Sequence, residues 1–370
     1  MREPVDRFDV AVVGAGPAGS LAARAAAEGG ARTVLLDHRR EIGQPVQCGE
    51  FLPSPRELAD LFDCRSLIAA AYDAPPTTVL RETRWMSCVS PYGHRYRFPL
   101  EGCTVSRRAF DKALAARAEG AGAELRFPTG VTGVADDEVR CSDGNRIRAR
   151  VIVGADGPTS TVAHSVGFRP QRTMFRMITA TVDGPLGDEI WLYFGRAAPH
   201  GYAWCFPRAH DANVGLGVAY LPAATSLGRL LDRFAARERL GPVRERTPWW
   251  VPIGPPPESL VVGRTVFAGD AANLVMATNG GGIPTAMLSG WLAGTAAARH
   301  VRDGAPLAEY DTEWRRALYP PLARAARVQR FADRIGRWDP LLALGMRYIG
   351  VSGLDAMMRL RWPPRLGGAS

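Results

Sequence analysis

The feature that most constrains the fold is the stretch DVAVVGAGPAGSLAARAAAEGG, typical of a buried strand, a glycine turn and an alanine-rich helix. Gly14, Gly16 and Gly19 fill the GxGxxG pattern. The first glycine permits a tight turn, the second lets a pyrophosphate approach the backbone, and the third packs the helix on the strand. A second strand ends at Asp37, where a carboxylate can accept hydrogen bonds from a ribose. The chain is therefore predicted to contain a Rossmann-like α/β unit that binds a dinucleotide.

Two later stretches indicate which dinucleotide is bound. The segment RARVIVGADG predicts a strand that runs into Asp156 and Gly157, and RTVFAGD predicts one that runs into Asp270. Together with the glycine loop, they resemble the FAD-binding fold of the p-hydroxybenzoate hydroxylase and glutathione reductase superfamily. The resemblance implies that Asp270 binds the ribityl and pyrophosphate region of FAD.

Two further cofactor contacts are expected, the first from the same resemblance and the second from backbone geometry. Arg107 precedes a helix predicted at 108–119 and is the expected contact, with Arg108 as the alternative. A glycine run at 280–282 opens another helix, IPTAMLSGWLAGTAAARH, and the missing Cβ atoms let backbone N–H groups approach a flat ligand. If that ligand is the isoalloxazine, the helix N-terminus stabilises negative charge on the reduced ring.

Composition limits the partners of this unit. The 370 residues suffice for two or three domains, and a content of 46% hydrophobic and 22% charged residues is that of a globular protein. The formal net charge is +9, and Lys112 is the single lysine, so arginine supplies nearly all of the positive charge. Arginine spread along the chain argues against nucleic acid and suits anionic cofactors or an anionic lipid surface.

Cysteine spacing and the apolar runs indicate the compartment. The six cysteines lack CxxC spacing, which argues against a zinc site or a disulfide framework and suits a reducing cytoplasm. The N-terminal stretch MREPVDRFDVAVVGAG does not resemble a signal peptide, and no apolar run approaches the roughly 18 residues of a membrane span. We therefore expect a cytoplasmic monomer that is soluble or lies on a membrane surface.

Two segments between the cofactor motifs predict a second domain. Residues 72–100 contain short strands, and residues 168–255 contain four strand-length stretches bounded by Gly, Pro, Asp or Asn. They predict an antiparallel substrate-binding sheet with the helix SLGRLLDRFAARERLG packed on one face. The FAD-binding domain is predicted at residues 1–71, 101–167 and 256–305, and a C-terminal helical region at 306–370.

Aromatic residues follow two of these strands. The stretch PHGYAWCFP places Tyr202, Trp204 and Phe206 at alternate positions, so their rings share one face of a strand. Trp191 and Tyr193 alternate in the same way on the preceding strand. We expect adjacent strands to combine these rings into one surface. On composition alone such a stripe favours interior packing, and a wall that contacts substrate is the alternative.

A second resemblance favours the wall. The element PVQCGE matches the pattern P-x-x-C-G-E at Pro45, Cys48, Gly49 and Glu50, and PHGYAWCFP matches P-x-x-Y-x-W-x-F-P. Combined with the FAD motifs, these elements resemble the geranylgeranyl reductase family, which includes archaeal digeranylgeranylglycerophospholipid reductases and chlorophyll-pathway and menaquinone side-chain reductases. The resemblance implies an FAD-dependent lipid-biosynthesis enzyme that saturates isoprenoid double bonds in a hydrophobic tunnel, with Cys48 close to the flavin.

The implied reaction needs a hydride from N5 of the reduced flavin and a proton from the protein or from water. An isolated alkene is not electrophilic, so protonation must accompany or precede hydride transfer. Aromatic faces can stabilise the resulting positive charge by roughly 1–2 kcal/mol each. Cys48 is the proton donor or positioning group that the family suggests, and Tyr202 is the rival. No second GxGxxG follows a strand, so the donor is left open between NAD(P)H acting without a separate domain and a reduced carrier.

The predicted site residues form three groups, and no metal site is predicted. The catalytic candidates are Cys48, Tyr202 and Trp204. The substrate-binding candidates are Trp191, Tyr193, Tyr202, Trp204 and Phe206. The cofactor-binding candidates are Gly14, Gly16, Ala18, Gly19, Asp37, His38, Cys48, Gly49, Arg107, Asp156, Gly157, Asp270, Gly281, Gly282 and Ile283.

Two other function classes share this scaffold. A flavin-dependent monooxygenase, acting as a hydroxylase or epoxidase on a hydrophobic substrate, needs few protein acids. A halogenase would need a catalytic lysine, whereas Lys112 lies on the predicted cofactor helix. A non-catalytic prenyl-lipid-binding flavoprotein is the third class, although such a protein could lose the FAD motifs that are intact here. The C-terminal region mixes arginine with apolar residues, which suits a packed helical layer, a cap on the tunnel or a membrane contact.

Overall fold

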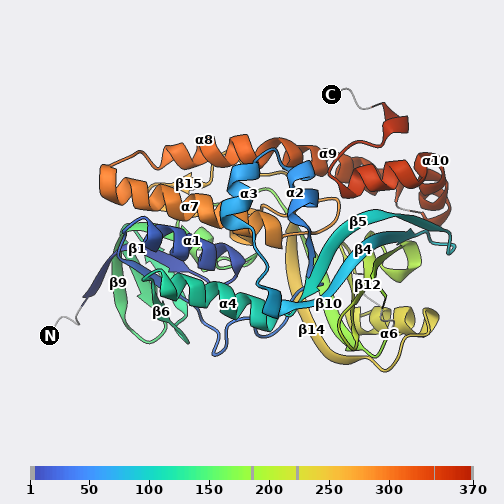
Figure 1. Ribbon diagram of the computed structural model, residues 1–370, viewed down its shortest axis with the longest axis horizontal. Coiled ribbons are helices and arrows are strands. Elements are labelled where there is room, and N and C mark those ends of the chain that lie inside the picture. Colours follow the sequence, from blue (N-terminus) through green and yellow to red (C-terminus); the bar gives the residue numbers. More distant parts are fainter. Residues whose placement is uncertain (1–4, 185–186, 222–224, 337, 368–370) are drawn as a thin grey trace.

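A computed structural model describes residues 5–184, 187–221, 225–336 and 338–367, and it contains two large sheets joined by helices (Figure 1). The first sheet has the order β15-β16-β9-β1-β2-β6, with β8 paired to β9 and β7 paired to β8. Strand β1 pairs in parallel with both β2 and β9. This is the predicted Rossmann-like unit. Its strands are β1 (Val5–Val13), β2 (Thr33–Leu36), β6 (Glu124–Arg126), β7 (Val131–Ala135), β8 (Glu138–Cys141), β9 (Arg146–Gly154), β15 (Val261–Val262) and β16 (Thr265–Phe267).

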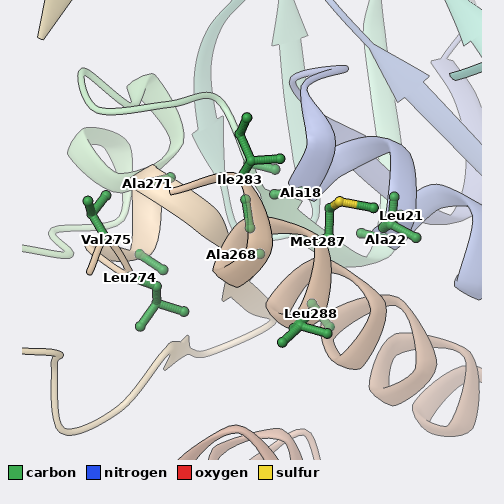
Figure 2. Packing of buried hydrophobic residues seen from close by; sticks show 14 of the residues in the cluster. Ala18, Leu21, Ala22, Ala268, Ala271, Leu274, Val275, Ile283, Met287 and Leu288 are labelled. Carbon is green, nitrogen blue, oxygen red and sulfur yellow. The ribbon is translucent and has the colours of Figure 1, made fainter. Parts of the chain in front are cut away.

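Helix α1 packs tightly on helix α7 beside this sheet (Figures 1 and 2). A Cβ atom at Gly290 or Gly294 would lie 2.1 Å from the carbonyl oxygen of Ala18 or Ala22, so the two backbones are in direct contact. Apolar side chains of both helices fill the space around this contact. The helices are α1 (Pro17–Glu28), α2 (Pro55–Leu61), α3 (Arg65–Ala71), α4 (Arg107–Gly120), α5 (Thr161–Ser165), α6 (Leu227–Arg237), α7 (Ile283–Asp303), α8 (Ala308–Ala317), α9 (Tyr319–Ile335) and α10 (Asp339–Met358).

The second sheet has the order β14-β10-β13-β12-β11-β4-β5-β3. The predicted antiparallel neighbours β11, β12 and β13 are confirmed, and α6 covers one face of the sheet through β10 and β13. Two pairings differ from a simple meander, because β10 pairs with β13 and β14, and β11 lies parallel to β4. The strands are β3 (Phe51–Pro53), β4 (Val79–Val89), β5 (Arg95–Val105), β10 (Thr173–Val182), β11 (Glu189–Phe194), β12 (Gly201–Pro207), β13 (Ala212–Val218) and β14 (Arg244–Ile253).

The second sheet extends past the boundaries predicted from the sequence. The boundary expected between residues 100 and 101 falls inside β5, which continues to Val105 and pairs there with β3. Strand β3 directly follows the Cys48 segment, so this pairing ties that segment to the second sheet. The division into domains otherwise stays a prediction.

The C-terminal region consists of α8, α9 and α10, as expected for a helical region. Its prolines begin helices, since Pro320 and Pro321 lie in the first turn of α9 and Pro340 in that of α10. Helix α10 is long and apolar enough to cross a membrane by length and composition alone. Only 28% of its most apolar window is buried inside the protein, so this helix is not a core helix. Arg347 and Asp355 divide the apolar run, as the sequence prediction requires, and the helix meets the criterion only through its mean hydropathy of 1.2.

Candidate functional site

A single cavity of about 1180 Å³ connects the glycine loop after β1 with the aromatic residues of β12. It is lined by residues of both sheets and by the start of α7. Almost all of the predicted site residues line it, and those that do not are Gly19, Trp191 and Tyr193. Segments far apart in the sequence therefore form one continuous space.

The three glycines of the loop have the backbone geometry that their three predicted roles require. Gly14 has a φ of +99°, and a Cβ atom there would lie 2.4 Å from the carbonyl oxygen of Ala155. A Cβ atom at Gly19 would lie 1.7 Å from the carbonyl oxygen of Gly14, so this residue packs the helix on the loop. At Gly16 a Cβ atom would meet no protein atom within 4 Å. The backbone at Gly16 is therefore open to the cavity, as a pyrophosphate requires.

Asp37 directly follows β2 and lines the wall of the cavity. Its carboxylate accepts a hydrogen bond from the backbone N–H of Ala15 at 2.7 Å and a bidentate pair from the guanidinium of Arg39 at 2.8 and 2.7 Å. Burial opposes its ionisation, but the hydrogen bonds and charge of Arg39 outweigh burial and lower the pKa of Asp37. A ribose would meet an ionised carboxylate with Arg39 beside it, while His38 lies exposed at the cavity rim.

The two other predicted acids, Asp156 and Asp270, differ in what their carboxylates contact. Asp156 accepts hydrogen bonds from the Ser160 hydroxyl at 2.5 Å and the Val162 N–H at 3.1 Å, so its carboxylate holds the start of α5. Asp270 instead lies at the cavity with its carboxylate close to Gly282. Burial raises the pKa of Asp270 to about 6, against the opposing charges of Arg107 and Arg172. A hydroxyl-bearing ligand would supply the polar contacts that this carboxylate needs.

Arg107, not Arg108, faces the cavity. Its guanidinium forms a bidentate pair with Asp111 at 2.9 and 2.8 Å, whereas Arg108 binds Glu41 at the surface. The positive charge of Arg107 lies close enough to Cys48 to lower the pKa of the thiol, but burial has the larger effect and raises it overall. Cys48 therefore keeps its proton at neutral pH.

The glycine run before α7 contacts the aromatic strand. Gly280 has a φ of +69°, and a Cβ atom there would lie 2.7 Å from the hydroxyl oxygen of Tyr202. That hydroxyl donates a hydrogen bond to the carbonyl oxygen of Asn279 at 2.6 Å. Gly281, Gly282 and Ile283 line the cavity at the start of α7. The segment is thus an ordered loop at a helix N-terminus, as predicted.

Tyr202, Trp204 and Phe206 form one wall of the cavity. Neighbouring ring centroids on the strand lie 6.1 and 6.2 Å apart. Trp249 of β14 meets Trp204 edge-on at 5.9 Å, and Phe51 of β3 lies 6.1 Å from Phe206. Trp204 is buried and still lines the cavity, so the stripe is both core and wall.

Trp191 and Tyr193 do not join this wall, and the prediction of one pooled surface is wrong. In the register of β11 and β12, Trp204 lies opposite Leu192, and Tyr193 lies opposite Ala203. Side chains opposite each other share a face, so Trp191 and Tyr193 point to the other side. Tyr193 packs edge-on against Phe234 of α6, with the ring centroids 5.0 Å apart.

The Cys48 segment is fixed to the aromatic strand by Asn213 of β13. The fully buried Asn213 amide donates to the carbonyl oxygen of Cys48 at 2.9 Å and to the carboxylate of Glu50 at 3.0 Å. Its side-chain oxygen accepts from the indole N–H of Trp204 and the hydroxyl of Thr179, both at 2.8 Å. A Cβ atom on Gly49 would lie 2.8 Å from the Phe206 ring. The two motifs that suggested the family are therefore in direct contact.

Sequence reasoning missed Asn213, Trp249 and the role of Glu50. Glu50 has a φ of 70°, is nearly fully buried, and pairs with Arg208. One available signal was NVGLG, in which Asn213 and two glycines alternate on one strand face. A Cβ atom at Gly215 would lie 2.2 Å from the Trp204 ring, so this glycine makes room for the wall, whereas one at Gly217 would meet the Met177 side chain.

The residues around the glycine loop fit FAD. The open backbone at Gly16, the acid at the end of β2 and the buried carboxylate of Asp270 match its pyrophosphate, ribose and ribityl groups. Known proteins agree with this geometry, since a family model described as an FAD binding domain matches residues 7–214. A digeranylgeranylglycerophospholipid reductase of Methanocaldococcus jannaschii is 30% identical over 363 residues, covering 90% of this chain and 89% of the relative.

The chain belongs to the geranylgeranyl reductase family. Digeranylgeranylglycerophospholipid reductase 1 of Methanothermobacter thermautotrophicus is 33% identical over 356 residues, covering 88% of this chain and 87% of the relative. The geranylgeranyl bacteriochlorophyll reductase-like protein of Thermoplasma acidophilum has the same fold, with a TM-score of 0.81, 24% identity and coverage of 97% and 94% of the two chains.

The fold is shared beyond the geranylgeranyl reductase family. A probable FAD-dependent monooxygenase from Pseudomonas aeruginosa has a TM-score of 0.67 at 18% identity, with coverage of 92% of this chain and 100% of that chain. The resemblance and the FAD-binding α/β fold predicted from the motifs are confirmed. Which residues act in catalysis stays a prediction.

Proposed function

We propose that this protein is an FAD-dependent reductase that saturates carbon–carbon double bonds in the isoprenoid chain of a lipid. The observation that supports this most directly is the cavity, which extends from the open backbone at Gly16 to the rings of Tyr202 and Trp204. The sequence relatives named digeranylgeranylglycerophospholipid reductase, at 30% and 33% identity, support the same reaction class.

The aromatic end suits this substrate in two ways. A prenyl chain gains about 0.8 kcal/mol for each CH₂ group buried, so it needs few polar contacts. The faces of Tyr202, Trp204 and Trp249 would stabilise positive charge as the alkene is protonated, by roughly 1–2 kcal/mol each where water is excluded. Reduced FAD, when bound, supplies the hydride, and the alkene gains that hydride and one proton.

Cys48 is the proposed source of the proton. Burial raises its pKa above the ordinary value of 9.0, so the thiol is protonated at neutral pH, and it lies on the cavity wall. The rival hydroxyl of Tyr202 already donates its hydrogen to the carbonyl of Asn279 at 2.6 Å. We therefore assign Tyr202 to the wall and to the support of the glycine loop.

The proposal also includes the electron donor, the compartment and the oligomeric state. NAD(P)H or a reduced carrier would deliver two electrons, and the enzyme would act as a cytoplasmic monomer that takes its substrate from a membrane surface. Stopped-flow mixing of the oxidised protein with NADPH, and separately with reduced ferredoxin, would identify the donor by the rate of flavin bleaching.

An anaerobic turnover tests the reaction. The bound flavin is reduced with dithionite, a geranylgeranyl lipid is added, and flavin reoxidation is followed together with the mass of the lipid. Reoxidation with a gain of two hydrogens per turnover is expected. Reoxidation that requires oxygen and yields an oxygenated lipid would instead support a monooxygenase, and tight lipid binding without any redox change a binding protein. Cys48→Ala should slow the single turnover without displacing FAD. Cys205→Ala, on the face of β12 that points away from the aromatic wall, is the control and should keep the native rate.

A further inference from the structure

Helix α10 presents a continuous apolar face to solvent. Trp338, Leu341, Leu344 and Tyr348 are 74%, 43%, 63% and 55% exposed. Their spacing of three or four residues places them on one side of the helix. Together with Val351, they are five of the nine large apolar side chains that are exposed among the described residues. Solvent-exposed apolar residues are thus concentrated on one helix.

The opposite side of α10 is buried and fixes its orientation. Met346, Ile349, Leu354 and Met358 belong to the main core. The backbone bends at Gly350, where φ is 65° and ψ is −165°. A helix packed along one side and bent in the middle does not leave the protein to cross a bilayer. Its free face can instead lie along a surface.

The composition around this face matches an anionic lipid surface. Residues 306–370 carry eleven arginines against six acidic residues, an excess of five positive charges out of the chain's +9. Arg347, Arg361 and Arg365 are exposed on or near α10. Trp and Tyr place their rings at the boundary of water and lipid, and arginines bind the anionic head groups.

A second segment extends the face. The β4–β5 turn carries Tyr92, which is 60% exposed. A Cβ atom at Gly195 would lie within 2.8 Å of both Pro91, in this turn, and Asp339, at the start of α10. Tyr92 is therefore close to the beginning of the apolar face.

The far end of α10 reaches the cavity. Met358, in its last turn, lines the cavity, and its carbonyl oxygen accepts a hydrogen bond from the Asn279 side chain at 3.0 Å. Asn279 is also the residue whose carbonyl binds the hydroxyl of Tyr202. One helix thus connects the exposed apolar face with the wall on which the prenyl chain is proposed to lie.

We infer that α10 and Tyr92 dock the protein on an anionic lipid bilayer, with the Met358 end of the helix directed to the entry of the lipid chain. This inference rests on the proposed function for the identity of the lipid that enters. We call the residues Tyr92, Trp338, Leu341, Leu344, Tyr348 and Val351 the docking face.

Vesicle flotation with the FAD-loaded protein tests the docking. The probes are vesicles of pure phosphatidylcholine and vesicles with about 30% phosphatidylglycerol. The native protein should float with the anionic vesicles and much less with the neutral ones. Leu344→Glu should weaken this binding at least about tenfold, because it removes a leucine that would be buried in the bilayer and adds a charge that the anionic surface repels. Phe127→Glu, at an exposed apolar residue directly after β6 of the first sheet, is the matched control and should bind as the native protein does.

The outcomes separate this inference from the proposed function. Leu344→Glu should retain its bound flavin and reduce a detergent-dispersed geranylgeranyl substrate at the native rate, while losing activity on lipid presented in vesicles. Equal binding of Leu344→Glu and native protein would overturn the docking face. So would a native dimer that Leu344→Glu converts to a monomer, since the face would then bind a second copy. Vesicle binding without any lipid reduction would overturn the proposed function alone.

Discussion

The two ends of the cavity are built in different ways. At the cofactor end, Gly14, Gly16 and Gly19 lie in one short segment, and their roles follow from local backbone geometry. At the aromatic end, Cys48, Trp204 and Asn213 come from distant segments and hold one another through side-chain hydrogen bonds. The cofactor end depends on the space that the glycines leave for a ligand. The aromatic end depends on hydrogen bonds that already join its own side chains. Substitutions should therefore separate cofactor binding from turnover.

The largest effect is expected at the cofactor end. Gly16→Val should lower FAD affinity by at least about 1000-fold, because the side chain fills the space through which a pyrophosphate approaches. The chain should stay folded, since Gly16 has an extended backbone and no protein atom within 4 Å of a Cβ position. Flavin absorbance per protein after gel filtration, with a thermal melt beside it, measures both. A stoichiometric flavin content in Gly16→Val would contradict the assignment.

At the aromatic end, Trp204→Ala should retain FAD and lose about 100-fold in turnover, since the cation-stabilising ring and the support of the Cys48 segment both disappear. Tyr193→Ala, on the opposite face of the same sheet, is the matched control. It should lose stability through its contact with Phe234 and keep the native turnover per bound flavin. Equal loss of turnover in both variants would show that the two faces do not differ in function.

Asn213→Ala should have a smaller effect of about tenfold on turnover, because the partners stay but lose their alignment. The Trp204 indole and the Cys48 carbonyl each lose a hydrogen bond, at a cost of about 1–3 kcal/mol where the group stays buried. Alkylation of Cys48 by iodoacetamide should become faster as its segment loosens. Thr179→Val removes the 2.8 Å hydrogen bond to Asn213 and a long 3.5 Å contact to the Cys48 carbonyl, and it leaves the hydrogen bonds that join Asn213 to Cys48 and Trp204. It should therefore change the turnover and the alkylation rate of Cys48 much less than Asn213→Ala does. An unchanged alkylation rate in Asn213→Ala would rule out this positioning role.

Asp270→Asn is expected to alter stability and its dependence on pH, measured in the FAD-free protein. Burial raises the pKa of Asp270 to about 6 from 3.8, so its contribution to stability is complete below pH 3.8 and is lost as the pH rises through about 6. Asp270→Asn should therefore gain about 1–3 kcal/mol relative to native protein between pH 4 and pH 7. Urea unfolding at both pH values measures this. A stability difference between the two proteins that does not change with pH would show that folding does not raise the pKa of Asp270.

The outcome for the aromatic strands shows where sequence reasoning ends. Alternation correctly predicted that Tyr202, Trp204 and Phe206 share a face, because side chains alternate along any strand. It could not place Trp191 and Tyr193, because the face depends on the register between β11 and β12. A shift of one residue in that register exchanges the two faces. Only the paired sheet fixes it.

The sequence by itself determined the cofactor end, because the glycine spacing and the acids after two strands act through local backbone geometry. It also identified the family, since two short motifs were specific in combination. The tertiary structure alone decided that Asn213 joins these motifs, that Trp249 completes the wall, and that α10 leaves one apolar face uncovered. Each of these depends on contacts between distant segments, and a pattern within one segment does not show which distant segment packs against it.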